Sequence, residues 1–174
     1  MIRLELEIDE EQLAVLADKI GSCKKIVLMG AGKSYLAALV STKIANSYGL
    51  KWYCIDAYNS LHGDLGIVSP HDLIVAISKS GETRELIQAI RLLDGNEVVS
   101  LTFSDNANNR LADLSSINLN IPVDEQAPHD CAPLNSSVLT QVVLNEVIRR
   151  LASSVHEESY KNNHAGGAIG EKFV

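Results

Sequence analysis

Apolar residues along this chain follow two patterns, short continuous runs and runs with helical spacing. The continuous runs are rich in β-branched residues and are typical of strands buried on both faces. They predict five strands, at residues 24–29, 51–56, 73–77, 97–103 and 117–123. Helical spacing predicts helices at residues 9–20, at 33–48, from about Glu82 onward and after residue 137, with one helical turn inside the polar loop 106–113.

Strands and helices alternate in this order along the chain. The alternation predicts a doubly wound α/β fold, a three-layer sandwich built on a five-stranded parallel sheet with right-handed crossovers. In such sheets ligands bind outside the carboxyl ends of the strands. The turns at Gly30, Ser78 and Asp124 each follow a predicted strand, so we expect all three at one edge of the sheet.

The composition is that of an ordinary globular protein, and it narrows the possible functions. The 174 residues are enough for one domain with a sizeable core. A net charge of −7 and a pI of about 5.2 argue against broad nucleic-acid binding. No apolar stretch is long enough to span a bilayer, and the N-terminus does not resemble a signal peptide. Three isolated cysteines predict reduced thiols in a cytoplasmic protein: Cys23, Cys54 and Cys131.

The stretch from Asp72 to Glu85 is the most informative in the chain. It joins a buried strand to an amphipathic helix through a turn rich in hydroxyls and glycine, Ser78, Ser80, Gly81 and Thr83. Backbone N–H groups and hydroxyls at such a helix N-terminus favour a phosphate. The alternative is an ordinary connection in which Ser80 or Thr83 only caps the helix.

A second turn, Gly30–Ser34, joins the first strand to the next helix. Gly30 and Gly32 form half of a GxGxxG pattern, with Tyr35 in the place of the third glycine, and the spacing does not match a Walker A loop. The glycines are also explained by a sharp turn alone. Lys33 is either a cation at the mouth of a phosphate or oxyanion site, or a solvated residue that begins the helix.

Three further segments carry polar residues. His62 lies between turn-forming residues, where a histidine is more often a surface group than a catalyst. Residues 124–137 are irregular and rich in protic groups, and Asn135, Ser136 or Ser137 is expected to cap the next helix. Residues 162–170 are rich in glycine, so if they are ordered we expect a neighbouring subunit to hold them.

Taken in order, these motifs resemble a sugar isomerase (SIS) domain. Residues 78–85 are similar to the family's phosphosugar motif, S-x-S-G-x-T-x-E. Within the family the chain most resembles the D-arabinose-5-phosphate isomerases, at residues 30–34, 61–66, 132–133 and 164–170. Many of these isomerases carry a pair of CBS modules after the last motif. This chain resembles the short form that consists of the SIS domain alone.

The resemblance implies a single flavodoxin-like SIS domain over residues 1–174. Its expected parts are an N-terminal helix at 9–20, an α/β core at 24–155 and a segment at 156–174 that completes the active site. Members of the family are typically homotetramers, and the expected sites are shared between subunits. Members of the family need no metal and no organic cofactor. The expected binding partner of this chain is a sugar phosphate, and neither nucleic acid nor a membrane is expected to bind.

The implied reaction is an aldose–ketose isomerisation of a sugar phosphate through an enediolate. The expected pair is D-ribulose 5-phosphate and D-arabinose 5-phosphate, which supplies Kdo for lipopolysaccharide or capsule. Two alternatives remain. The substrate is another sugar phosphate, or the domain is a non-catalytic sensor that binds a sugar phosphate and regulates a partner.

The resemblance also implies how the substrate is held and converted. The phosphate is expected on the hydroxyls and backbone of Ser78, Ser80, Gly81, Glu82 and Thr83, with further contacts from Gly32, Ser34 and Ser136. The reaction needs a base, a group that moves protons between oxygens, and a donor to the enediolate.

By motif matching, four residues fall on the functional positions of the family. Lys33 is expected on the developing oxyanion, Glu125 as the leading candidate base and His164 as an acid–base group. Glu85 either acts as a base or holds Lys33 in place, and its alternative is a solvated acid at a helix start. His62 is a second histidine candidate.

The chain also departs from the family pattern after the fifth strand. Counting back from Pro133 places Glu125 on the catalytic acid, whereas counting forward from Val123 places Gln126 there. If Gln126 holds that position, the base is missing. Leu134 removes a hydroxyl near the site and Tyr35 adds bulk at its mouth, changes that would alter the substrate rather than the class of reaction.

Overall fold

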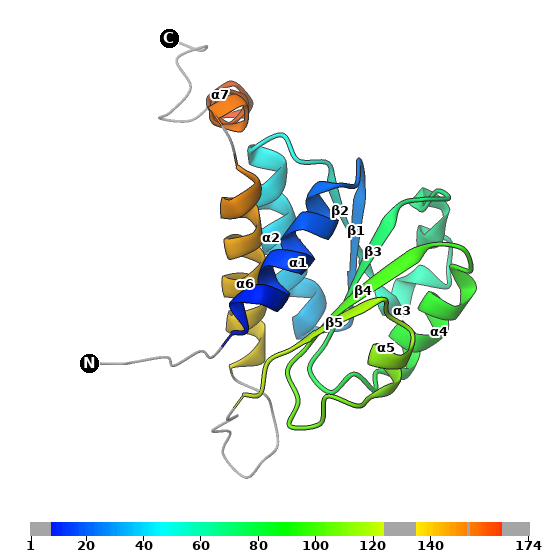
Figure 1. The fold of residues 1–174 in the computed structure, drawn as a ribbon. Coiled ribbons are helices and arrows are strands. Elements are labelled where there is room, and N and C mark those ends of the chain that lie inside the picture. Colours follow the sequence, from blue (N-terminus) through cyan, green and yellow to red (C-terminus); the bar gives the residue numbers. More distant parts are fainter. Residues whose placement is uncertain (1–7, 124–134, 153, 165–174) are drawn as a thin grey trace.

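A five-stranded parallel sheet forms the centre of the computed structural model, which describes residues 8–123, 135–152 and 154–164 (Figure 1). The strand order is β2-β1-β3-β4-β5, and every neighbouring pair is parallel. The strands are β1 (Ile26–Gly30), β2 (Trp52–Asp56), β3 (Leu73–Ser78), β4 (Glu97–Thr102) and β5 (Ile117–Asn120). This order is that of flavodoxin-like folds. The predicted doubly wound parallel sheet is confirmed.

Helices cover both faces of the sheet, as Figure 1 shows, so the predicted three-layer sandwich is confirmed too. One face carries α1 (Glu10–Gly21), α2 (Lys33–Ser47) and α6 (Ser136–Leu151). The other carries α3 (Ala57–Ser60), α4 (Arg84–Leu92) and α5 (Arg110–Asp113). The described elements also include the 3₁₀ helix η1 (Asp64–Ile67) and α7 (Ser154–Asn163).

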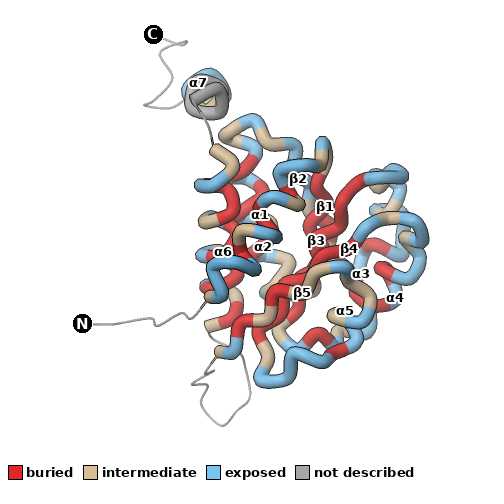
Figure 2. The backbone as a smooth tube through the Cα atoms, viewed as in Figure 1, coloured by how far each residue is buried: buried red, intermediate tan, exposed pale blue. Residues whose placement is uncertain are grey.

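The strand side chains divide the core into two halves. In β3, Val75 and Ile77 pack with α1, α2 and α6, whereas Ile74 and Ala76 pack with α4. Every residue of β1 and β3 is buried, which Figure 2 shows as continuous red in the middle of the sheet. Burial on both faces is the reason that these strands are continuous apolar runs rather than alternating ones.

Several boundaries differ from the sequence prediction. Helix α4 begins at Arg84 rather than near Glu82, because Gly81 has a φ of +70° and Thr83 is extended. Strand β5 ends at Asn120 rather than at residue 123. The short elements α3 and η1 and the polar helix α7 were not predicted, because their sequences carry too little apolar periodicity.

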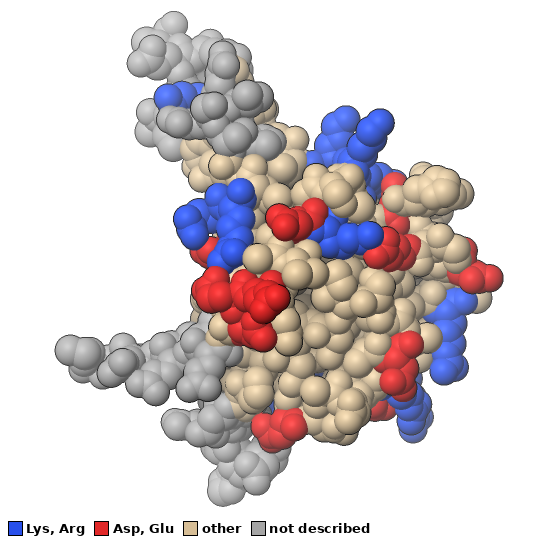
Figure 3. All heavy atoms as spheres, in the orientation of Figure 1, with Lys and Arg blue, Asp and Glu red and all other residues tan. Residues whose placement is uncertain are grey.

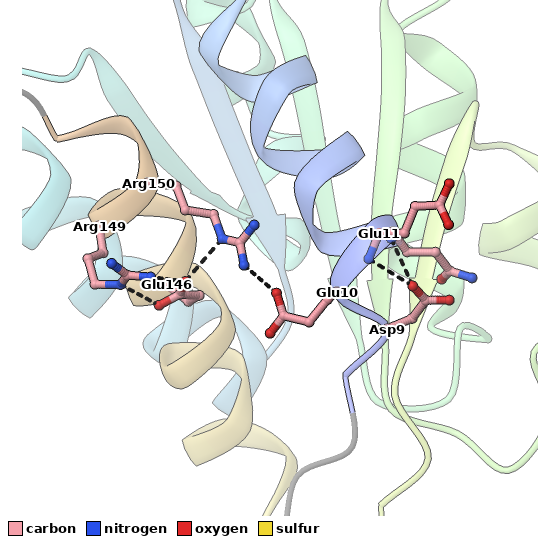
Figure 4. Close-up of polar contacts among 7 residues, drawn as sticks. Asp9, Glu10, Glu11, Glu146, Arg149 and Arg150 are labelled. Carbon is pink, nitrogen blue, oxygen red and sulfur yellow. Dashed lines mark hydrogen bonds and ion pairs between the residues drawn. The ribbon is translucent and has the colours of Figure 1, made fainter.

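Charged residues tie α1 to α6. On the face shown in Figure 3, acidic atoms gather over the start of α1 and basic atoms over the end of α6. Asp9 caps α1 by accepting hydrogen bonds from Glu11 N and Gln12 N. Arg150 of α6 binds both Glu10 of α1 and Glu146 of its own helix (Figure 4).

Candidate active site

The carboxyl ends of β1 and β3 meet at the edge of the sheet where functional turns were predicted. Strand β1 ends at Gly30 and β3 ends at Ser78, and Gly30 is paired with Ile77. The chain then turns to opposite faces, since α2 follows β1 on one face and α4 follows β3 on the other (Figure 1). This is the topological switch point of the sheet, where ligands bind in open α/β folds.

The turn from Ser78 to Thr83 is shaped by its own hydroxyls. The Ser78 hydroxyl accepts a hydrogen bond from Gly81 N at 3.0 Å and lies 2.9 Å from the Thr83 hydroxyl. Ser78 is only 2% exposed, whereas Ser80 is exposed and accepts from Glu82 N at 3.2 Å. Thr83 is the N-cap of α4, but within the described residues its side chain makes no capping hydrogen bond. The first-turn N–H groups of α4 are therefore open to an anion.

A second segment braces this turn from outside. A Cβ atom on Gly81 would lie 2.0 Å from Asn109 Oδ1, so only glycine fits there, as its φ of +70° also requires. Leu111 N donates to Gly81 O at 3.0 Å. Arg110 binds the Glu82 carboxylate through its backbone N–H and its Nε, each at 3.0 Å. The Glu82 side chain is thus engaged with Arg110, while its backbone N–H donates to the Ser80 hydroxyl.

The turn before α2 presents a cation beside open space. Gly32 is the N-cap of α2 with φ of 55° and ψ of −122°, and no described atom lies within 4 Å of where its Cβ would be. Lys33 is exposed at the first helical position, and Ser34 is half-buried. Burial raises the pKa of the half-buried Tyr35 hydroxyl, so this residue stays neutral at physiological pH.

Three more of the predicted residues lie near this edge of the sheet. Glu85 is half-buried in the first turn of α4. Ser136 is the first residue of α6 and is 6% exposed, and Figure 1 shows α6 and α2 starting at the same end of the fold. His62 is exposed just after α3, which itself follows the carboxyl end of β2.

His164 lies at the opposite end of α2 from Lys33. Asn163, the last residue of α7, donates its Nδ2 to Ser47 O at 3.2 Å, where α2 ends. The His164 ring stacks on the Tyr160 ring with centroids 4.2 Å apart, and its Nδ1 lies 2.9 Å from Tyr160 O. The 15 residues of α2 span about 21 Å. A single chain therefore does not bring His164 beside Lys33.

The two candidates for the base, Glu125 and Gln126, lie outside the described residues, as do residues 132–133 and 165–170 of the predicted motifs. In the part of the chain that the structure describes, no group of three or more His, Cys, Asp and Glu side chains is arranged to hold a metal ion. No described helix is both long and apolar enough to cross a membrane.

Sequence reasoning missed Asn109 and Arg110, although both contact the turn that it singled out. They belong to an asparagine-rich loop, residues 106–109, and to the helix start after it. Polar residues after a predicted strand were a usable signal, because that position is the ligand-binding edge of a parallel sheet. The pairing with Gly81 and Glu82 was not predictable from spacing, since the two segments are distant in the chain.

The edge of the sheet thus combines a helix start without a side-chain cap and an exposed cation on the neighbouring turn. The first turn of α4 supplies open backbone N–H groups, and the turn before it supplies the exposed Ser80 hydroxyl. Lys33 adds a positive charge and Glu85 a negative one. This arrangement suits a small phosphorylated ligand whose other end carries a group that gains negative charge.

This chain is similar in sequence to known sugar-phosphate isomerases. The chain is 30% identical over 185 residues to arabinose 5-phosphate isomerase KdsD of Yersinia pestis, and the match covers 97% of this chain and 56% of that protein. The chain therefore spans about half the length of the curated relatives that it matches.

Two solved structures share the fold. One is an Escherichia coli CFT073 protein in complex with arabinose 5-phosphate, with a TM-score of 0.76 and 32% identity, covering 82% of this chain and 77% of that one. The other is a Listeria monocytogenes protein proposed to be a sugar-phosphate isomerase, with a TM-score of 0.79 and 26% identity, covering 91% of this chain and 85% of that one. Residues 19–148 match the model of the SIS domain family. The chain belongs to the SIS domain family.

Proposed function

We propose that this protein is a phosphosugar aldose–ketose isomerase that interconverts D-ribulose 5-phosphate and D-arabinose 5-phosphate. The observation that carries the proposal is the turn Ser78–Thr83, an anion-binding helix start at the topological switch point beside Lys33. The relatives named as arabinose 5-phosphate isomerases support the same substrate, and so does the similar structure with arabinose 5-phosphate bound.

In this proposal the phosphate binds at the start of α4. The exposed Ser80 hydroxyl and the first-turn N–H groups of α4 donate to its oxygens, while the buried Ser78 hydroxyl keeps the turn in shape through Gly81 N and Thr83. The rest of the sugar is lined by Gly32 and Ser34 at the start of α2 and by Ser136 at the start of α6. The open space at Gly32 leaves room for the ligand to approach the backbone.

The reaction transfers a proton between two neighbouring carbons through an enediolate. The base, for which we propose Glu125, removes the proton from the carbon beside the carbonyl and returns it to the other carbon. Lys33 stabilises the negative charge on the oxygen, and Glu85 orients Lys33 or assists as a base. His164, or alternatively His62, moves protons between the oxygens. No step calls for a metal or an organic cofactor.

We further propose that the protein works as a homo-oligomer, a tetramer, in which His164 of one subunit completes the site of another. Two observations support this assembly. Within one chain His164 lies at the far end of α2 from Lys33. The packed helices α2 and α6 also expose large apolar side chains, Leu36, Val40, Val138 and Val142. Such side chains favour contact with a second copy.

The proposed product supplies Kdo for lipopolysaccharide or capsule. Because phosphorylated sugars do not cross membranes unaided, we place the reaction in the cytoplasm.

The test is turnover of ribulose 5-phosphate by the pure protein without added metal, followed by NMR detection of arabinose 5-phosphate. We expect a rate well above background, a loss of at least about a hundredfold in Glu125→Gln, and a small effect of Gln126→Asn as the matched control. A large loss in Gln126→Asn alone would move the functional position to Gln126. A panel of other pentose and hexose phosphates separates this substrate from its alternatives.

If the protein converts neither ribulose 5-phosphate nor any sugar phosphate of the panel, yet binds one of them saturably, the isomerase proposal is overturned. The domain would then be a sensor of the ligand that it binds.

A further inference from the structure

The end of β4 and the residues that lead from it into the asparagine-rich loop are held in place by β5. Asn120 Nδ2 donates to Ser104 O at 2.9 Å, and Ser104 N donates back to Asn120 Oδ1 at 3.3 Å. The fully buried Thr102 hydroxyl lies 3.1 Å from Asn118 Oδ1 and 2.8 Å from Asn120 Oδ1. Because a buried polar group is costly to leave unpaired, this ladder favours one arrangement of the loop.

Asn109 connects the asparagine-rich loop to the turn that follows β3, because its side chain packs against Gly81. The Asn109 side chain is 5% exposed, and its Nδ2 donates to Asn106 O and Ala107 O, both at 3.3 Å. Its Oδ1 accepts from Ala112 N at 2.9 Å. The amide is thus satisfied inside its own segment, and its carbon and oxygen atoms form the surface against which the Gly81 α-carbon packs.

Glu82 and Arg110 close the contact from the outside. Two bonds of 3.0 Å join the Glu82 carboxylate to Arg110 N and Nε, although the two side chains are 43% and 63% exposed. An ion pair this exposed adds little to global stability. Its position matters more, because it fixes the residue next to the N-cap of α4.

We propose that Glu82, Asn109 and Arg110 are positioning residues that hold the turn Ser78–Thr83 in its anion-binding shape before a ligand arrives. The inference rests on the proposed function, which places the substrate phosphate at this turn. A loop that adopts the binding shape only part of the time has an affinity reduced by that fraction. Loosening this contact therefore weakens phosphate binding without any loss of a ligand contact.

The direction in which Glu82→Ala changes the affinity for phosphate tests this proposal directly. Glu82→Ala removes a negative charge near an anion site, so the loss of Coulomb repulsion alone would tighten the binding of inorganic phosphate. The positioning role predicts the opposite, a dissociation constant for phosphate and a KM for the sugar phosphate raised roughly fivefold to tenfold, with kcat nearly unchanged. Glu82→Gln keeps an oxygen for Arg110 N and is expected to lose less.

Glu146→Ala is the matched control, because it makes the same change of charge and also breaks a carboxylate–arginine pair, on α6. We expect it to leave both constants within about twofold of the wild type. Asn109→Ala, which changes no charge and is expected to weaken phosphate binding in the same way, provides a second variant if Glu82→Ala does not fold, as judged by circular dichroism.

Phosphate binding by Glu82→Ala as tight as in the wild type, or tighter, would overturn the positioning role and leave the proposed function intact. Failure of the wild-type protein to bind either inorganic phosphate or a sugar phosphate would overturn both.

Discussion

Lys33 and His164 lie at the two ends of helix α2. Lys33 is its first residue, and His164 follows α7, which is bonded through Asn163 to the backbone oxygen of Ser47. The helix between them spans about 21 Å. If both residues act on one substrate molecule, they must come from different subunits.

Mixed oligomers of Lys33→Ala and His164→Ala chains are expected to regain activity that neither variant has alone. Random mixing gives about a quarter of the sites both wild-type residues, so about a quarter of the wild-type rate should return. The measurement is isomerase activity after the two variants are unfolded and refolded together. A mixture of Lys33→Ala with Glu85→Ala is the control and should stay inactive, since these residues are proposed for one subunit's site.

Recovery in the control mixture, or none in the first mixture despite proven mixed oligomers, would contradict the sharing of sites.

Gly81→Ala is expected to damage both stability and phosphate binding. The new Cβ would meet Asn109 Oδ1 at 2.0 Å, in addition to the strain of a φ of +70°. Gly95→Ala is the matched control, because Gly95 has a φ of +87° and no described atom lies within 4 Å of its Cβ position. We expect Gly95→Ala to lower the free energy of unfolding by roughly 1 kcal/mol and Gly81→Ala by a further 1–3 kcal/mol or so.

Urea denaturation checks both values. Equal losses in the two glycine variants would show that the Asn109 side chain moves aside freely. The double change Gly81→Ala with Asn109→Ala should recover part of the difference.

The Cys54 thiol is expected to resist alkylation. Burial raises its pKa to about 12, and its Sγ lies 3.8 Å from Tyr35 O. Because only the thiolate reacts, folded protein at pH 8 should be modified by iodoacetamide far more slowly than the same protein in urea. The variant Cys23→Ser with Cys131→Ser isolates Cys54, and mass spectrometry follows the reaction. Rapid labelling of the folded chain would contradict the prediction.

Glu146 is expected to make stability depend on pH in the acid range. Hydrogen bonds from Arg149, and then from Arg150, lower its pKa from 4.5 to about 2. A lowered carboxyl pKa stabilises the folded state above the unfolded-state pKa, and this contribution disappears as the pH falls toward the folded-state value. The difference in unfolding free energy between the wild type and Glu146→Gln should therefore be largest above pH 4.5 and shrink toward pH 2.

Because these charges are partly exposed to solvent, which screens them, we expect that difference to stay below about 1 kcal/mol. Urea denaturation at pH 7, 5 and 3 measures it. A difference that grows as the pH falls would contradict the assigned cause.

The sequence alone was enough to predict the layers of the fold and the position of the turn Ser78–Thr83. Five continuous apolar runs separated by helical patterns allow one main solution, a parallel sheet covered on both faces. The turn at Ser78–Thr83 was also predictable, because its serines, glycine and threonine act on backbone atoms only a few residues away. Interactions this local leave their pattern in neighbouring positions of the chain.

Only the tertiary structure decided which residues surround the turn Ser78–Thr83, and that Lys33 and His164 lie at opposite ends of α2. Asn109 packs on Gly81, and Arg110 binds Glu82, across a strand and a helix of intervening chain. The folding of α7 onto the end of α2 likewise separates His164 from Lys33. No periodicity or spacing encodes such contacts, because they depend on how distant segments pack once the sheet has formed.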